Sequence, residues 1–102
     1  MKMYHSTSVE AAKEIKTDGF LVGPVYLTPS RKIAEAYGAN NSDKFFVIEL
    51  DVDESLFCAD AEFVKGEMSI DQAVEESLSN GSVYIDGDLS IEGAEFHFFE
   101  MD

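Results

Sequence analysis

The 102-residue sequence is poor in cysteine, in basic residues and in long apolar runs. Its single cysteine, Cys58, rules out a disulfide within the chain and favours a reducing compartment, so we expect a cytoplasmic protein. The longest apolar run, residues 45–48, ends at Glu49 and is far too short to span a membrane. The first residues show no signal-peptide pattern. We therefore expect one domain over residues 1–102, with no membrane partner.

The basic residues are few and unevenly placed. Seven Lys and Arg stand against 21 Asp and Glu, which gives a net charge of −14. Residues 45–102 contain only one basic residue, Lys65. Since affinity for phosphates rests on Lys and Arg, we expect no direct binding to nucleic acid. The acidic half would attract a basic protein, such as one that itself binds nucleic acid, or it could serve only to keep the chain soluble.

The hydrophobic pattern predicts an α+β fold, because helices and strands follow one another without regular βαβ alternation. We expect strands at residues 2–6, 25–28, 45–52, 82–85 and 95–101, and helices at residues 9–17, 30–38 and 69–78. Ser8 and Ser30 are suited to cap the first two helices, and Gly19 and Gly38 to end them. Residues 39–43 are predicted to form a polar loop. Residues 86–88 are predicted to form the turn between the last two strands.

The third predicted helix is amphipathic. Its apolar residues Ile70, Ala73, Val74 and Leu78 are expected to face the core, with Glu75 and Glu76 in solvent.

Four side chains stand out as candidates for chemistry. Taken alone, His5 is most simply a hydrogen-bonded core residue. Tyr26 alternates with apolar neighbours on a strand, and Tyr37 ends the apolar stripe of a helix. Glu95 opens a strand that is rich in phenylalanine, where a carboxylate costs solvation unless it has a partner or a task. It could also be an edge-strand charge that prevents aggregation.

Together these residues form an ordered set. The segments are Tyr4-His5-Ser6-Thr7, Val25-Tyr26-Leu27-Thr28-Pro29-Ser30, Ala36-Tyr37 and Ala94-Glu95-Phe96. The set resembles the His-Tyr-Glu signature of ADP-ribosyltransferases of the diphtheria-toxin and poly(ADP-ribose) polymerase class. This resemblance implies two small, mostly antiparallel sheets with an NAD+ cleft between them. It also implies cleavage of NAD+ and transfer of ADP-ribose to a target, here a protein.

The resemblance also assigns roles. His5 would hold the nicotinamide ribose, backbone atoms beside it would hold the carboxamide, and Tyr26 and Tyr37 would stack on the nicotinamide ring. The residues expected to bind NAD+ are His5, Ser6, Thr7, Tyr26, Thr28 and Tyr37. Glu95 would stabilise the positive charge that develops on the ribose carbon, as at the oxocarbenium-like centre of glycosidases.

The identity of the catalytic acid stays open at this point, because Asp88 and Glu92 lie just upstream of Glu95. Gly93 stands two residues before Glu95, which argues against the arginine-specific subclass. No metal site is expected: the sequence has no His/Cys cluster, and the turn at residues 86–88 lacks the full oxygen set of an EF-hand.

Two other functions are compatible with the sequence. One is an acidic, non-enzymatic inhibitor on the same fold, which would cover a nucleic-acid-binding surface as a DNA mimic does. The other is an RNA 2′-phosphotransferase, for which Arg31 and Lys32 alone provide few basic groups. A small acidic transferase would suit a phage or mobile-element effector that inactivates a host protein.

Overall fold

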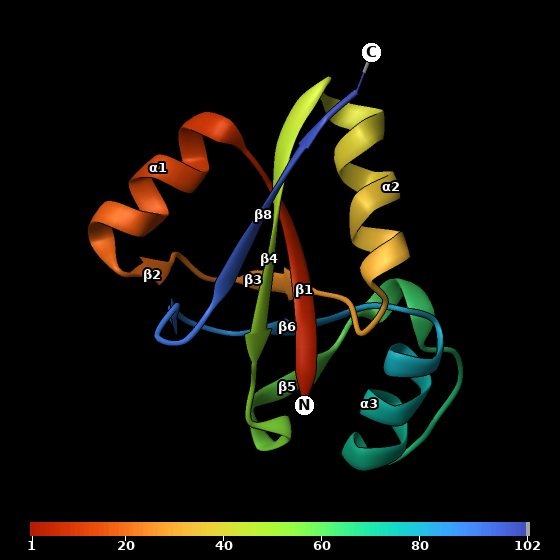
Figure 1. The fold of residues 1–102 in the computed structure, drawn as a ribbon. Helices are drawn as coiled ribbons and strands as arrows, with labels where there is room; N and C mark the ends of the chain where they lie inside the picture. Colours follow the sequence, from red (N-terminus) through yellow and green to blue (C-terminus); the bar gives the residue numbers. More distant parts are fainter. Residues whose placement is uncertain (102) are drawn as a thin grey trace.

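The computed structural model of the chain describes residues 1–101 and shows an α+β fold with three helices and three small antiparallel sheets (Figure 1). The helices are α1 (Val9–Asp18), α2 (Arg31–Asn41) and α3 (Ile70–Ser79), and the 3-10 turns are η1 (Glu54–Leu56) and η2 (Ala61–Phe63). The strands are β1 (Lys2–Ser8), β2 (Phe20–Leu21), β3 (Val25–Leu27), β4 (Lys44–Asp51), β5 (Phe57–Ala59), β6 (Val83–Ile85), β7 (Leu89–Ser90) and β8 (Glu95–Glu100). None of the described helices is both long and apolar enough to cross a bilayer.

The largest sheet has the strand order β1-β4-β8, and its register decides which side chains share a face. His5 lies opposite Ile48, which lies opposite Phe96, so these three side chains point to one face. Tyr4 and its partner Glu49 point to the other face. Figure 1 looks along the sheet and shows α1 and α2 on opposite sides of it. We call the side under α1 the α1 face and the side under α2 the α2 face.

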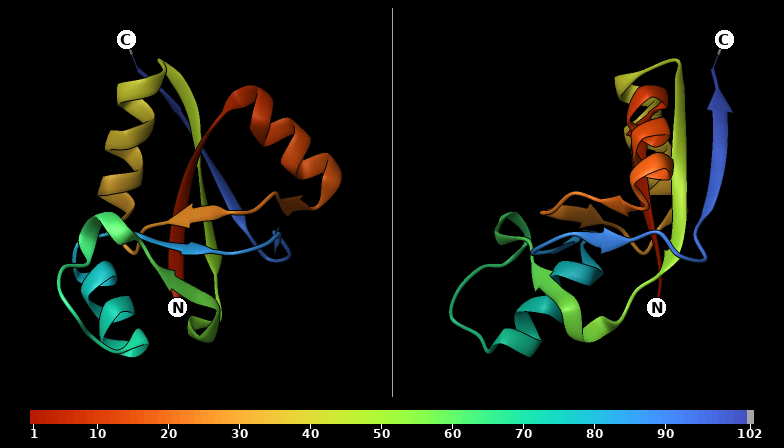
Figure 2. Two further views of the ribbon diagram at one scale, coloured as in Figure 1. Left: turned by 180° about the vertical axis from the view of Figure 1, so that it is seen from behind. Right: turned by 90° about the vertical axis from the view of Figure 1, so that its left-hand side faces the viewer.

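The main core lies on the α1 face, where Met3, Ile48 and Val83 are fully buried between the large sheet and the β3-β6-β5 sheet. Figure 2 shows this smaller sheet crossing below α1, with α3 packed at the far end of the molecule. A second, smaller core on the α2 face is formed by Phe45, Val47 and Ala34.

The second core explains why α2 is longer than predicted. We expected the helix to end at Gly38 and residues 39–43 to form a loop, which is wrong, because α2 continues to Asn41. Gly38 is buried, and a Cβ atom there would overlap the ring of Phe45 and the side chain of Ser6. The glycine therefore allows close helix–strand packing and does not terminate the helix.

The expected number of two sheets is also wrong, since the described residues form three. β2 pairs with β7 and β3 pairs with β6 in one continuous register, so the two pairs are a single antiparallel ribbon that is interrupted. At the interruption Gly23 faces Gly87, where a Cβ on Gly23 would overlap the Gly87 backbone. The backbone N–H of Gly23 donates to Asp88 Oδ1 at 3.0 Å in place of a ladder bond.

The other predicted helix caps are confirmed, whereas the predicted hairpin and one predicted core residue are wrong. Ser8 and Ser30 cap α1 and α2 as expected, and Gly19 ends α1 with a φ of 85°. The hairpin expected around residues 86–88 is wrong, because β6 pairs with β3 and β5, whereas β8 pairs with β4. Ile70 is 83% exposed and not in the core, since it is the first residue of α3 and lies beyond the turns that contact β5 and β6.

Candidate functional site

His5 is held in one orientation by the backbone of β3. Its Nδ1 lies 2.7 Å from the carbonyl oxygen of Tyr26. Since a carbonyl oxygen only accepts, Nδ1 carries the proton and donates it. Burial lowers the pKa of His5, and the hydrogen bond to Tyr26 opposes this only in part. The imidazole is therefore neutral at pH 7, and its Nε2 has no hydrogen-bond partner within residues 1–101.

The junction of β1 and β3 brings several of the predicted binding residues together. Tyr4 N donates to Thr28 O at 2.8 Å, and Thr28 N donates to Tyr4 O at 3.0 Å. Thr28 is buried, and its Oγ1 accepts from Ser30 N at 3.1 Å at the entry to α2. Ser6 and Thr7 continue β1 beyond His5 and point to opposite faces of the sheet. Of the residues predicted to bind NAD+, this junction brings together His5, Tyr26 and Thr28.

The two tyrosines of the predicted sandwich are placed differently. Tyr26 points away from the core, as predicted from its alternation with buried Val25 and Leu27, and it is half-exposed. Its ring lies 5.5 Å from that of Tyr84, tilted by 39°, and no ring contact joins it to Tyr37 within residues 1–101. Tyr37 is exposed on α2. Tyr84, which was not predicted from the sequence, is therefore the ring that lies beside Tyr26.

Tyr84 is itself part of a small polar surface. Cys58 on β5 lies directly opposite Tyr84 on β6, so both side chains share the outer face with Tyr26. The pKa of the Tyr84 hydroxyl is raised, chiefly by its charge–charge interaction with the neighbouring Cys58. Because the ordinary pKa of a tyrosine, 10.0, is already well above physiological pH, the Tyr84 hydroxyl is neutral and can donate a hydrogen bond.

The three candidate acids lie in different places. Asp88 is exposed and contacts the chain that leads into β3, through its bond with Gly23 N. Glu92 is an exposed turn residue whose backbone N–H donates to Ser90 Oγ. Glu95 lies on the α2 face, whereas His5 lies on the α1 face and two strands away. The sheet thus separates Glu95 from His5.

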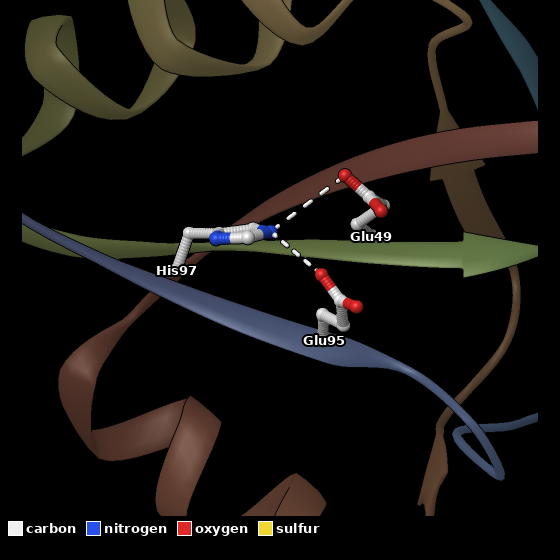
Figure 3. Close-up of side chains that lie close together, drawn as sticks. All are labelled: Glu49, Glu95 and His97. Atoms are coloured by element: carbon white, nitrogen blue, oxygen red, sulfur yellow. Dashed lines mark ion pairs between the residues drawn. The ribbon is translucent and has the colours of Figure 1, made fainter.

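Glu95 belongs to a second cluster on the α2 face, together with Glu49 and His97 (Figure 3). His97 Nε2 lies 3.6 Å from Glu49 Oε1 and 3.6 Å from Glu95 Oε2. This cluster was not predicted from the sequence, because Glu49 and Glu95 meet only through the register of β4 and β8. Side chains two residues apart on a strand share a face, which puts Glu95 and His97 of β8 together.

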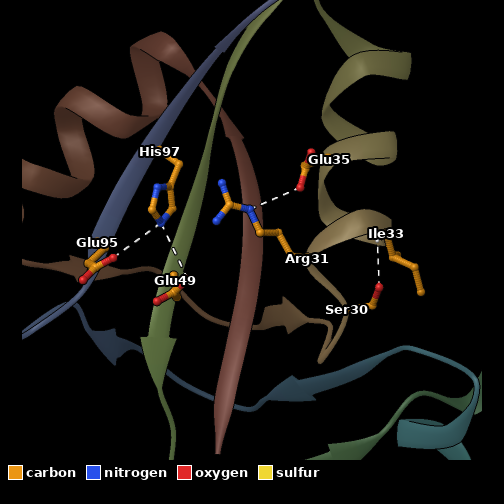
Figure 4. A network of polar contacts seen from close by, with 7 residues as sticks. All are labelled: Ser30, Arg31, Ile33, Glu35, Glu49, Glu95 and His97. Carbon is orange, nitrogen blue, oxygen red and sulfur yellow. Dashed lines mark hydrogen bonds and ion pairs between the residues drawn. The ribbon is translucent and has the colours of Figure 1, made fainter.

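Arg31 at the start of α2 lies near the same cluster, as Figure 4 shows. Its Nε donates to Glu35 Oε2 at 3.2 Å, and its guanidinium carbon lies 5.9 Å from the centre of the Phe99 ring. Arg31 is therefore paired with Glu35 and packs on Phe99, both on the α2 side of the sheet.

The neutral state of the half-buried His5 leads to a prediction about pH. In the unfolded chain His5 titrates near its ordinary pKa of 6.5, whereas its pKa in the folded protein is lower. Below pH 6.5 the unfolded state therefore binds the proton first, and the stability that neutral His5 contributes above this pH is lost as pH falls toward the folded-state pKa. Urea unfolding at pH 7.5 and pH 5.5 should show a larger acid-induced loss for wild type than for His5→Gln. Equal losses would contradict the lowered pKa.

No protein-family model, no curated protein and no solved structure matches this chain.

Proposed function

We propose that the chain binds NAD+ at the junction of β1 and β3 and transfers its ADP-ribose to a protein acceptor. The observation that carries this proposal is the hydrogen bond from His5 Nδ1 to the Tyr26 carbonyl. It fixes a neutral imidazole whose free Nε2 is a hydrogen-bond acceptor, suited to a ribose hydroxyl. Strand β3, which supplies this carbonyl, also presents the half-exposed ring of Tyr26. An aromatic face attracts a flat, positively charged ring such as the nicotinamide of NAD+.

The chemistry requires a carboxylate near the ribose. The bond between ribose C1′ and the nicotinamide nitrogen breaks, nicotinamide leaves with the electron pair, and positive charge develops on the ribose. A carboxylate stabilises this charge until the acceptor attacks C1′ and loses its proton to solvent. We assign this role to Asp88, because its carboxylate contacts the chain leading into β3, whereas Glu95 lies on the opposite face of the large sheet from His5.

The experiment measures nicotinamide release and the transfer of label from adenine-labelled NAD+ to proteins of a bacterial lysate. We expect His5→Ala and Asp88→Asn to lower both rates about 100-fold, the range seen when one stabilising group is removed from a reaction centre. Asn at position 88 still offers a side-chain oxygen to Gly23 N, so the turn is preserved. Asp86→Asn, an exposed acid in the same turn, is the matched control.

Each outcome has a defined meaning. Loss with Glu95→Gln and not with Asp88→Asn would move the carboxylate role to Glu95. Absence of NAD+ binding by calorimetry, together with no nicotinamide release, would overturn the proposal.

A second function has its own supporting observation. An open cleft of about 450 Å³ beside α3 is lined by Glu67, Glu75 and Glu76, and an adjoining one includes Glu62. Such a surface suits a basic protein partner, as expected of an acidic inhibitor that mimics DNA. In this case partner binding would need no NAD+, would weaken with salt, and would be lost in a Glu75→Lys/Glu76→Lys variant but not in His5→Ala.

A further inference from the structure

The starting point is a pair of like charges that the sheet holds together. Glu49 on β4 and Glu95 on β8 are direct cross-strand partners, so their side chains leave the same face side by side. Like charges directly opposite one another destabilise a sheet. The Glu49 side chain is only 16% exposed, and a carboxylate so far removed from water requires a counter-charge. This pair therefore points to a cation.

The basic side chains near Glu49 and Glu95 neutralise these two carboxylates only in part. Lys2 Nζ lies 3.5 Å from Glu49 Oε2, but Lys2 is mostly in solvent, where such a pair contributes little. Glu49 Oε1 and Glu95 Oε2 turn instead toward His97. Arg31 is engaged with Glu35 and Phe99.

The His97 ring supplies a second, independent observation. Its Nε2 is buried and, within residues 1–101, has no hydrogen-bond partner. The 3.6 Å distances to the two carboxylates exceed those of an N–H···O bond. A buried polar nitrogen is normally satisfied, so one without a partner calls for an explanation such as an ion. Figure 3 shows this nitrogen pointing between the two carboxylates.

We propose that Glu49, Glu95 and His97 bind a divalent transition-metal ion, with Zn²⁺ the best fit. Zn–N and Zn–O bonds of about 2.0–2.2 Å put the ligand atoms of a tetrahedral site about 3.4 Å apart. Nε2 already lies 3.6 Å from each carboxylate oxygen, and all three ligand atoms lie within 4.8 Å of one another. The Glu95 side chain is 67% exposed and free to rotate, so it can close the remaining gap.

The ligand types select the class of metal. An imidazole nitrogen disfavours Ca²⁺ and Mg²⁺, which prefer oxygen ligands, and favours Zn²⁺ and its neighbours. Three protein ligands leave a fourth position for water. Because Glu49 belongs to β4 and the other two ligands to β8, the ion would clamp β8 to the rest of the sheet. This metal site lies on the opposite face of the sheet from His5, so Zn²⁺ binding can be tested independently of NAD+ binding.

The experiment uses the full chain after removal of metal by a chelator. Calorimetric titration with ZnCl₂ should show one Zn²⁺ per chain, and at a hundredfold excess over the dissociation constant the Tm should rise by about 10 °C or more. In His97→Gln the dissociation constant should rise at least about tenfold, since even the loss of an outer partner of a metal ligand costs this much. His5→Gln, which removes the only other histidine, should bind Zn²⁺ as wild type does.

Glu95→Gln separates a metal site from a purely structural role. Without Zn²⁺ this variant should be at least as stable as wild type, because it relieves the repulsion with Glu49. With Zn²⁺ it should lose most of the rise in Tm. In ¹⁵N spectra of the wild type, the ring nitrogens of His97 should shift on Zn²⁺ addition while those of His5 do not. Unchanged Zn²⁺ affinity in His97→Gln, or no Tm rise in wild type, would overturn the proposal.

Discussion

Replacement of Phe45 by alanine should lower the free energy of unfolding by about 3–5 kcal/mol. Phe45 is fully buried on the α2 face, where its ring stacks on Phe99 with centroids 5.1 Å apart and planes within 5°. It also fills the space that Gly38 leaves open in α2. An alanine here would leave a cavity between helix and strand that α2 cannot close, because Gly38 already lies against the side chain of Ser6 on β1. Urea unfolding followed by circular dichroism measures the loss.

The matched control for this prediction is Phe98→Ala. Phe98 is the same side chain on the neighbouring strand, but it is 53% exposed on the α1 face. Its replacement should cost less than about 1 kcal/mol, as is usual for exposed positions. A domain of this size has a total stability of about 5–15 kcal/mol, so Phe45→Ala should leave only a marginal fold. Similar losses for both variants would contradict the role assigned to the second core.

Replacement of Ser77 by alanine should cost about 2–3 kcal/mol, although it removes a single oxygen atom. Ser77 is fully buried in α3, where its hydroxyl donates to the carbonyl of Ser82 and accepts from the backbone N–H of Asp60 at 2.9 Å. Asp60 Oδ2 in turn accepts from Ser82 Oγ at 2.9 Å. The variant would leave a backbone donor and a backbone acceptor unpaired, and each such group costs about 1–3 kcal/mol when buried.

Ser79→Ala is the control, since Ser79 is exposed two residues further along the same helix. Its replacement should change the free energy of unfolding by no more than about 0.5 kcal/mol. Amide exchange provides a second readout for Ser77→Ala: protection should fall first around Asp60 and Ser82. A loss spread evenly over the large sheet would argue against a local polar anchor.

The sequence predicted the features that depend on neighbours along the chain. Ser8, Ser30 and Gly19 act at helix ends because their side chains or backbone satisfy groups within one turn. The strand at residues 45–52 matches β4 to within one residue at each end, since its run of β-forming residues is uninterrupted. The α+β class follows from the same local patterns.

The features that the sequence could not predict depend on distant partners. Gly38 has the signature of a helix end, and only the ring of Phe45 against it explains why α2 continues. Alternation along a strand puts Glu95 and His97 on one face, but only the registers of β8 and β1 against β4 decide that Glu49 joins them and that His5 lies on the other face. A resemblance to a family suggests roles for single residues, but it does not say how the strands that carry them are paired.

The order of the strands in the large sheet has a consequence for how the chain folds. The pairing of β4 with β1 joins residues 37–49 positions apart, and its pairing with β8 joins residues 46–56 positions apart, so each must close a long loop before it gains any contact. Chains built on such distant pairings fold slowly. Until residues 95–100 arrive, one edge of β4 presents unpaired N–H and C=O groups next to apolar side chains, a template for self-association. The repulsion between chains that each carry a charge of −14 would then keep unfinished molecules apart.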